Sequence, residues 1–162
     1  MFGRRTMFAA AAALGTAGGA AAATPVARFE VERSEQEWRR LLTPAQFRVL
    51  RQSNTERPYS SPLDTEARAG KFHCAGCELA VYDSTTKFDS GTGWPSFWAP
   101  VADAVGTSPD RAFFVLAQTE VHCARCGGHL GHVFDDGPRP TGKRYCMNGV
   151  AMTFRPSGGA AS

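Results

Sequence analysis

The five cysteines of this 162-residue chain are arranged as two close pairs and a single residue. The pairs are Cys74-Ala-Gly-Cys77 and Cys123-Ala-Arg-Cys126, and Cys146 stands alone. Two C-x-x-C units can supply four thiolates to one tetrahedral zinc ion and leave that ion no open coordination position. The pattern therefore predicts one structural Zn²⁺ per chain, bound by Cys74, Cys77, Cys123 and Cys126.

The two pairs are separated by 45 residues, a longer gap than in an ordinary zinc ribbon, so we expect a strand-rich insertion between them. Two disulfides, or one redox-active pair, are the alternative interpretation of the same cysteines. Iron would also fit four sulfurs, but nothing else in the sequence suggests electron transfer.

The N-terminus has the pattern of an export signal. Arg4 and Arg5 stand before an Ala- and Gly-rich stretch that ends at Ala23. A basic start, a weakly apolar middle and small residues at the end are typical of such signals, and adjacent arginines indicate the twin-arginine route. We predict a signal over 1–23, a linker over 24–33 and a periplasmic or otherwise exported mature protein. A membrane anchor is the alternative, disfavoured because the stretch is short and poorly lipophilic.

Export affects the interpretation of the cysteines, because thiols outside the cytoplasm tend to form disulfides. The twin-arginine route carries folded proteins. A chain that binds zinc before export would travel with its four thiolates already occupied.

Composition limits the classes of partner. Without residues 1–23 the chain has 16 basic and 15 acidic residues, which gives no argument for nucleic acid or an anionic membrane as a partner of the mature protein. The length and the 43% hydrophobic content suit a single globular domain. We expect a monomer with one domain over 34–156 and a disordered Gly/Ala/Ser-rich tail over 157–162.

The sequence changes character near Gly70. Before it, capping boxes at Ser34–Glu37 and Thr43–Gln46 predict two short helices. After it, short apolar runs between Gly and Pro clusters predict strands at 79–82, at 113–117 continuing to Val121, and at 145–154. The expected fold class is mainly β: antiparallel strands forming a twisted sheet or barrel-like domain, with a zinc-knuckle pair and a short helical N-terminal segment.

Cys146 is left over from the metal set, and an odd cysteine is a candidate nucleophile. Because side chains alternate along a strand, Arg144, Cys146 and Asn148 should share one face. A neighbouring arginine lowers the pKa of a thiol. The alternative is that Cys146 is a small buried hydrophobic residue.

Two further segments carry candidate site residues. His129 and His132 lie in a glycine-rich run directly after the second cysteine pair, and histidine is the natural proton donor near neutral pH. Trp94 lies in an aromatic loop, 90–98, that could form an apolar wall beside a thioether. Structural histidines and core-filling rings are the alternatives.

Three runs together resemble methionine sulfoxide reductase type B: Lys87–Phe97, His129–Phe134 and Arg144–Asn148. Both C-x-x-C units match the zinc-carrying form of this family, and the resemblance covers about Ser34 to Arg155. It implies reduction of the R epimer of methionine sulfoxide in oxidised proteins or peptides. A thioredoxin-like protein or a small thiol would be the reductant.

The resemblance also implies roles for individual residues. Cys146 would attack the sulfoxide sulfur, His129 and His132 would help activate the sulfoxide oxygen, and Asn148 would hold the site together. The substrate-binding residues would be Trp94, packed on the S-methyl group, with Phe134 and Arg144. The product on the enzyme would be a sulfenic acid on Cys146.

One residue departs from the pattern. Many family members have a second, resolving cysteine in the Gly-x-Gly-Trp loop, where this chain has Thr92. With the paired cysteines bound to zinc, no second free thiol remains. We therefore expect a one-cysteine cycle in which an external thiol attacks the sulfenic acid.

Two other functions compete with this one. A zinc-stabilised binding module with an inert Cys146 would not need the histidine run or the Cys146 strand. A redox centre formed by the C-x-x-C pairs themselves is disfavoured, because neither pair lies in a βαβ pattern.

Overall fold

The computed structural model describes residues 29–110 and 118–158. The predicted signal over 1–23, residues 24–28 of the predicted linker, the predicted strand residues 113–117 and the tail residues 159–162 lie outside these ranges.

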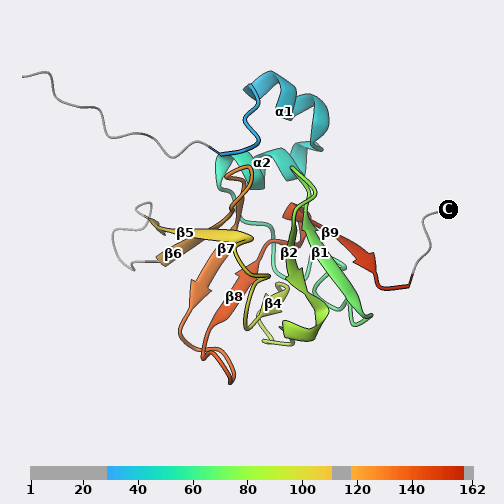
Figure 1. Ribbon diagram of the computed structural model, residues 1–162, viewed down its shortest axis with the longest axis vertical. Helices are drawn as coiled ribbons and strands as arrows, with labels where there is room; N and C mark the ends of the chain where they lie inside the picture. The colour runs from blue at the N-terminus through green and yellow to red at the C-terminus, as the bar shows by residue number, and fades with distance from the viewer. Residues whose placement is uncertain (1–28, 111–117, 159–162) are drawn as a thin grey trace, which may run out of the picture.

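Two short helices lie together at one end of the molecule (Figure 1). They are α1 (Glu35–Leu41) and α2 (Pro44–Gln52), and both predicted capping boxes are present, with Ser34 and Thr43 as the N-caps. Helix α2 packs its buried face against β7 and the turn η2 described below. Among the described residues, no helix has the length and apolar character needed to cross a bilayer.

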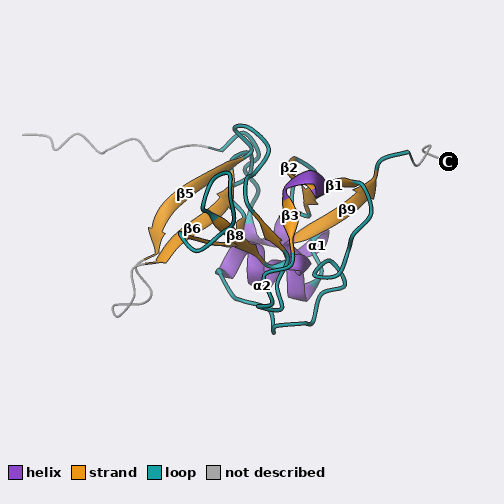
Figure 2. Cartoon of the chain, turned by 90° about the horizontal axis from the view of Figure 1, so that it is seen from below, coloured by secondary structure: helices purple, strands orange, loops and turns teal. Residues whose placement is uncertain are grey.

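The strands form two antiparallel sheets, which confirms the predicted fold class. The smaller sheet has the order β2-β1-β9, with β1 at Gly70–Cys74, β2 at Ala80–Asp83 and β9 at Met152–Pro156. The larger has the order β3-β4-β8-β7-β6-β5. Its strands are β3 (Lys87–Phe88), β4 (Ser96–Phe97), β5 (Val105–Asp110), β6 (Gln118–Cys123), β7 (His129–Phe134) and β8 (Arg144–Met147). Figure 2 shows β5 and β6 on one side of the helices and β1 and β9 on the other.

The prediction of one strand over 145–154 is wrong in one respect, because the chain forms two strands there with a turn between them. Strand β8 ends at Met147, a 3₁₀ turn η2 covers Gly149–Ala151, and β9 then joins the other sheet. The break is held by a residue from a distant part of the chain. The backbone N–H groups of Gly149 and Val150 donate to the carboxylate of Glu56 rather than to a neighbouring strand. A second 3₁₀ turn, η1, covers Ser84–Thr86.

The core lies between the two sheets, behind β8. Phe72 and Tyr82 of the smaller sheet meet Phe97 of the larger one, with ring centroids 4.9 and 4.3 Å apart. The Tyr82 hydroxyl donates to the sulfur of Met147 over 3.1 Å. All four side chains are fully buried. This packing fixes the inner face of β8, so that the alternate residues of the strand point to the other side.

Candidate functional site: a four-sulfur centre and a thiol cavity

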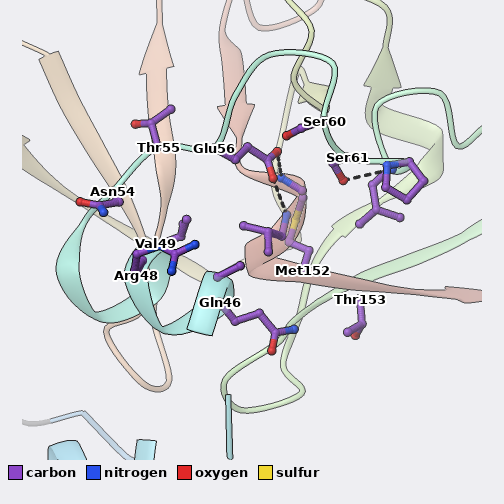
Figure 3. A pocket seen from close by; sticks show the side chains of 15 residues that line it. Gln46, Arg48, Val49, Asn54, Thr55, Glu56, Ser60, Ser61, Met152 and Thr153 are labelled. Atoms are coloured by element: carbon purple, nitrogen blue, oxygen red, sulfur yellow. Dashed lines mark hydrogen bonds between the residues drawn. The ribbon is translucent and has the colours of Figure 1, made fainter. Parts of the chain in front are cut away.

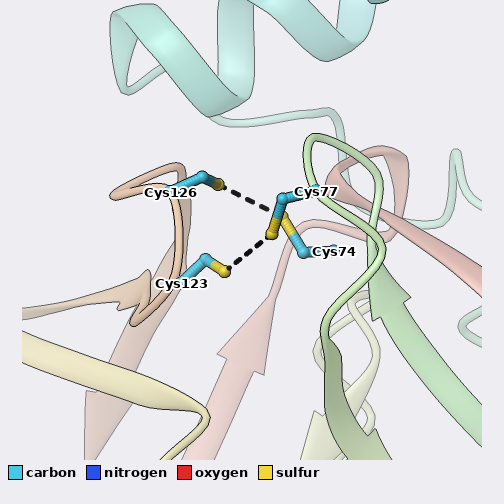
Figure 4. A group of neighbouring side chains, drawn as sticks. All are labelled: Cys74, Cys77, Cys123 and Cys126. Carbon is cyan, nitrogen blue, oxygen red and sulfur yellow. Dashed lines mark hydrogen bonds between the residues drawn. The ribbon is translucent and has the colours of Figure 1, made fainter. Parts of the chain in front are cut away.

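The four paired cysteines come together as the sequence predicts (Figure 4). Their sulfurs all lie within 4.8 Å of one another; Cys74 and Cys126 are 3.7 Å apart, and Cys77 and Cys123 are 3.5 Å apart. A zinc ion bound at about 2.3 Å separates its four sulfurs by about 3.8 Å, so these residues fit such an ion. A disulfide needs a sulfur–sulfur separation of about 2.05 Å, and all four cysteines are free in this structure, so it contains neither disulfide of the alternative interpretation.

Each cysteine pair forms a closed turn. The N–H of Glu78 donates to the carbonyl of Cys74 over 2.8 Å, and that of Gly127 donates to the carbonyl of Cys123 over 2.9 Å. Both donors have positive φ values, 65° and 67°. Gly127 suits this left-handed backbone, whereas Glu78 adopts it at some energetic cost. The two turns therefore point four sulfurs at a common centre.

Crowding separates the pKa values of the four thiols. A hydrogen bond with Cys123 raises the pKa of Cys74, whereas a hydrogen bond from Cys126 lowers the pKa of Cys123. Thiolates this close repel one another, so they cannot all be ionised without a cation among them. A divalent metal ion is the partner that this donor set accommodates.

The second feature is a cavity of about 230 Å³ that contains the fifth cysteine. Strand β8 places Cys146 between β4 and β7, opposite Ser96 on one side and His132 on the other. Cys146 is half-buried, and the hydroxyl of Thr92 lies 3.9 Å from its sulfur. The residues that line the cavity are Thr55, Trp94, Gln118, Gly131, His132, Phe134, Cys146 and Asn148.

A glycine allows the close approach of the two central strands. A Cβ atom on Gly131 would lie 2.1 Å from the carbonyl oxygen of Cys146. Any side chain there would push β7 away from β8 and separate His132 from Cys146.

Five of the seven predicted catalytic and substrate-binding residues line this cavity: Trp94, His132, Phe134, Cys146 and Asn148. The predicted alternation along β8 is confirmed for Cys146 and Asn148, which line the cavity, and for Met147, which faces the core. The other two predicted residues, His129 and Arg144, pack behind residues that line it.

His129 is buried, with 2% of its surface exposed. Its Nδ1 lies 2.8 Å from a carboxylate oxygen of Glu120, and its ring meets that of His132 edge to face at 5.3 Å between centroids. Burial raises the pKa of Glu120, but hydrogen bonds from Ser108 and His129 outweigh it and lower that pKa overall. An ionised Glu120 orients the His129 ring, and the His129 ring supports His132.

Arg144 packs its guanidinium over the ring of Phe134, 4.4 Å from the centroid, and makes a bidentate pair with Asp136 over 2.8 and 2.9 Å. Phe134 and Arg144 are directly opposite each other in the β7–β8 ladder. The arginine therefore holds the Phe134 wall of the cavity in place and keeps a positive charge near Cys146.

The pKa of Cys146 is raised, contrary to the expectation that Arg144 would lower it. Burial is the largest influence and raises the pKa; the Thr92 hydroxyl and the charge of Arg144 lower it by less. Arg144 thus acts in the predicted direction, but the loss of solvent around the thiolate outweighs it.

Sequence reasoning missed Thr55, Gln118, Glu120 and Glu56, which contacts two of the lining residues. Of these four residues, only Gln118 and Glu120 could have been predicted from a pattern in the sequence. Gln118 and Glu120 alternate along β6, the strand that runs into the second cysteine pair, so both could have been assigned to the histidine side of the sheet. Thr55 and Glu56 lie in a connector with no periodic pattern.

Comparisons with known proteins give one consistent result. A family model described as the SelR domain matches residues 42–156. A Pseudomonas putida protein named peptide methionine sulfoxide reductase MsrB is 48% identical over 131 residues, which cover 81% of this chain and 98% of that protein. A Methanosarcina barkeri protein of the same name is 50% identical, with 80% and 92% covered.

Among solved structures, the Mis18 "Yippee-like" domain covers 57% of this chain and 100% of its own, with a TM-score of 0.46 and 20% identity. This likeness is too slight to bear on the function.

The opposing influences on Cys146 predict the effect of removing Arg144. The rate of Cys146 alkylation should rise with pH around a midpoint above that of an ordinary thiol, because burial disfavours the thiolate. In Arg144→Ala the midpoint should move still higher, because a stabilising charge is lost. Iodoacetamide kinetics across pH, followed by mass spectrometry of the Cys146 peptide, measure both. A midpoint that falls in Arg144→Ala would contradict this assignment; Arg155→Ala, at an exposed position of β9, is the control.

Proposed function

Because this chain belongs to the SelR domain family, we propose that it reduces methionine (R)-sulfoxide in oxidised proteins or peptides to methionine, with Cys146 as the reacting group. The observation that carries the proposal is the cross-strand pair of Cys146 and His132, both facing the cavity that Trp94 lines. A nucleophile and a proton donor side by side in one small cavity are what sulfur–oxygen cleavage requires.

The reaction follows from this arrangement. The Cys146 thiolate attacks the sulfoxide sulfur while His132 donates a proton to the sulfoxide oxygen, so that a sulfur–sulfur bond forms and the sulfur–oxygen bond breaks. The released hydroxide then adds to Cys146 Sγ, and the sulfur–sulfur bond breaks with methionine as the leaving group. In balance, thiol and methionine sulfoxide become methionine and a sulfenic acid on Cys146. Trp94 packs on the S-methyl group, Phe134 and Arg144 complete the substrate-binding wall, and His129 and Asn148 orient the reacting groups.

The residue beside the reacting sulfur favours a one-cysteine cycle. Where many relatives carry a resolving cysteine, the Thr92 hydroxyl lies 3.9 Å from Cys146 Sγ. An external thiol, from a thioredoxin-like protein or a small molecule, then attacks the sulfenic sulfur, releases water and forms a mixed disulfide. A second external thiol releases free Cys146.

The four-sulfur centre would hold one zinc ion as a structural element. Four thiolates complete its coordination, so the ion would stabilise the fold and take no part in the chemistry at Cys146.

For the N-terminus we propose twin-arginine export to the periplasm. The family match begins at residue 42, so the Arg4–Arg5 segment lies outside the matched domain, as expected for an export signal. Zinc bound before export would protect the four thiols from oxidation outside the cytoplasm. In a variant with both Arg4→Lys and Arg5→Lys, the protein should stay in the cytoplasm, as measured by cell fractionation. Unchanged export of this variant would contradict the twin-arginine route. Equal zinc content after export of an unfolded chain would contradict the protective role.

The alternative, a zinc-stabilised binding module with an inert Cys146, explains the sulfur centre but not the cavity. A buried structural thiol has no need of a histidine, a tryptophan and a hydroxyl around it. A redox centre of the paired cysteines is also disfavoured, since all four sulfurs converge on one metal-sized space.

The direct test is turnover of peptides carrying either the R or the S sulfoxide, with dithiothreitol as reductant. The R epimer should be reduced and the S epimer left intact. Cys146→Ser should abolish turnover, and His132→Gln should lower kcat about 10²–10⁴-fold through loss of the proton donor. His122→Gln, which changes a histidine of β6 outside the cavity, is the control. Turnover by Cys146→Ser would overturn the proposal.

The one-cysteine cycle predicts a specific product in the absence of reductant. One equivalent of sulfoxide should leave Cys146 as a dimedone-reactive sulfenic acid, with no disulfide inside the chain, as read by mass spectrometry. Thr92→Cys is the positive control, because it places a second thiol beside Cys146 and should trap a disulfide between positions 92 and 146. An internal Cys146 disulfide in the unaltered protein would refute the cycle.

The metal assignment predicts that zinc and stability are lost together. Cys74→Ser should bind little zinc and unfold about 10 °C or more below the unaltered protein, since each kcal/mol is worth about 3 °C in a domain of this size. Cys146→Ser, the matched control, should retain one zinc per chain. Elemental analysis and thermal unfolding give both readouts; a fully stable, zinc-free Cys74→Ser would contradict the structural role.

A further inference from the structure

The connector between α2 and β1 passes between two cavities. One is the Cys146 cavity; the other, of about 530 Å³, lies against α2, η2 and β9 (Figure 3). Thr55 lines both cavities, and Glu56, the next residue, lines the larger one. This stretch of chain therefore forms part of the wall of the Cys146 cavity.

The Glu56 carboxylate is fixed by the segment that follows the reactive strand. One oxygen accepts from the N–H of Gly149 over 2.6 Å and the other from the N–H of Val150 over 2.9 Å, and both bonds are visible in Figure 3. Gly149 directly follows Asn148, so this carboxylate holds the end of β8 where the chain leaves the larger sheet.

The main chain of Glu56 binds two of the residues that line the Cys146 cavity. Its N–H donates to Oδ1 of Asn148 over 2.9 Å, and its carbonyl accepts from the indole N–H of Trp94 over 3.2 Å. The side-chain NH₂ of Asn148 in turn donates to the carbonyl of Leu130 in β7 over 3.1 Å. A single residue thus links Trp94, Asn148 and the η2 turn.

The connector is fastened a second time, three residues later. The N–H of Tyr59 donates to the carbonyl of Gly93 over 2.7 Å, and the Tyr59 hydroxyl donates to the carbonyl of Gly91 over 2.8 Å. A Cβ on Gly93 would lie 2.8 Å from the backbone nitrogen of Tyr59, so the two segments lie in close contact. These bonds hold the loop that carries Thr92 and Trp94 against the connector.

A carboxylate in this place has an energetic cost. Glu56 is half-buried, and burial raises its pKa, against the effect of the two N–H donors. Removing a carboxylate from water is unfavourable unless charge-assisted hydrogen bonds replace the water. The two donors do so, and they also select one position for the η2 turn.

We propose that Glu56 is a positioning residue for the substrate cavity: its carboxylate fixes η2 and Asn148, and its main chain fixes Trp94. The kinetic part of this inference rests on the proposed reductase function; the geometric part does not. Cys146 and His132 are held by the β7–β8 ladder and not by Glu56, so loosening the connector should disturb substrate binding more than the chemical step.

Two variants and one control test the inference. Glu56→Ala removes both acceptors, and Glu56→Gln keeps the shape but turns one acceptor into a donor that opposes a backbone N–H. We expect kcat/KM for an R-sulfoxide peptide to fall about 10–100-fold in Glu56→Ala, mostly as a rise in KM. A smaller change of the same kind should appear in Glu56→Gln. Glu35→Ala, at an exposed position of α1, should match the unaltered protein.

The second readout needs no turnover. Hydrogen exchange of the Trp94 indole N–H, identified by NMR with Trp94→Phe, should be at least about tenfold faster in the Glu56 variants, while the indoles of Trp38 and Trp98 keep their rates. Unchanged Trp94 exchange and unchanged KM would overturn the inference, even if the variants unfold at a lower temperature. An unaltered protein without reductase activity would refute the proposed function, and the exchange result would still decide the role of Glu56.

Discussion

The structure depends on the contact of four cysteine sulfurs at the junction of its two sheets. Cys74 ends β1 of the smaller sheet and Cys123 ends β6 of the larger one, and no strand of one sheet pairs with a strand of the other within 29–110 and 118–158. A metal ion among these sulfurs would therefore join two strands that no strand pairing connects. Such an ion would also fix the start of β7, because His129 lies three residues after Cys126.

The helices cover this centre. Trp38 of α1 is 2% exposed and packs beside the first cysteine turn, and Arg51 of α2 donates to the carbonyl of Cys126 over 3.0 Å. Figure 4 shows the helical segment lying above the four sulfurs. The N-terminal helices thus shield the sulfur centre from solvent, while Cys146 lies elsewhere, in a cavity open to a substrate. Separate surroundings allow four thiols to bind metal and one to react.

Local patterns in the sequence predicted much of this arrangement. Each capping box needs only four residues, and each C-x-x-C turn also needs four, so both could be recognised without the fold. The alternation that places Cys146 and Asn148 in one cavity follows from strand geometry alone. The break between β8 and β9 could not be predicted, because its cause is the Glu56 carboxylate, 93 residues away along the chain. The sign of the Cys146 pKa shift also needed the structure, since burial and the Arg144 charge act in opposite directions.

The central claim is that one sulfur reacts while four remain committed to a metal ion. Native protein treated with a limiting amount of an alkylating reagent, then analysed by mass spectrometry and for zinc, tests this claim directly. The account predicts that the label accumulates on Cys146 alone, that reductase activity falls in proportion, and that zinc stays bound. Loss of activity with the label on Cys74, Cys77, Cys123 or Cys126 and an unlabelled Cys146 would contradict it.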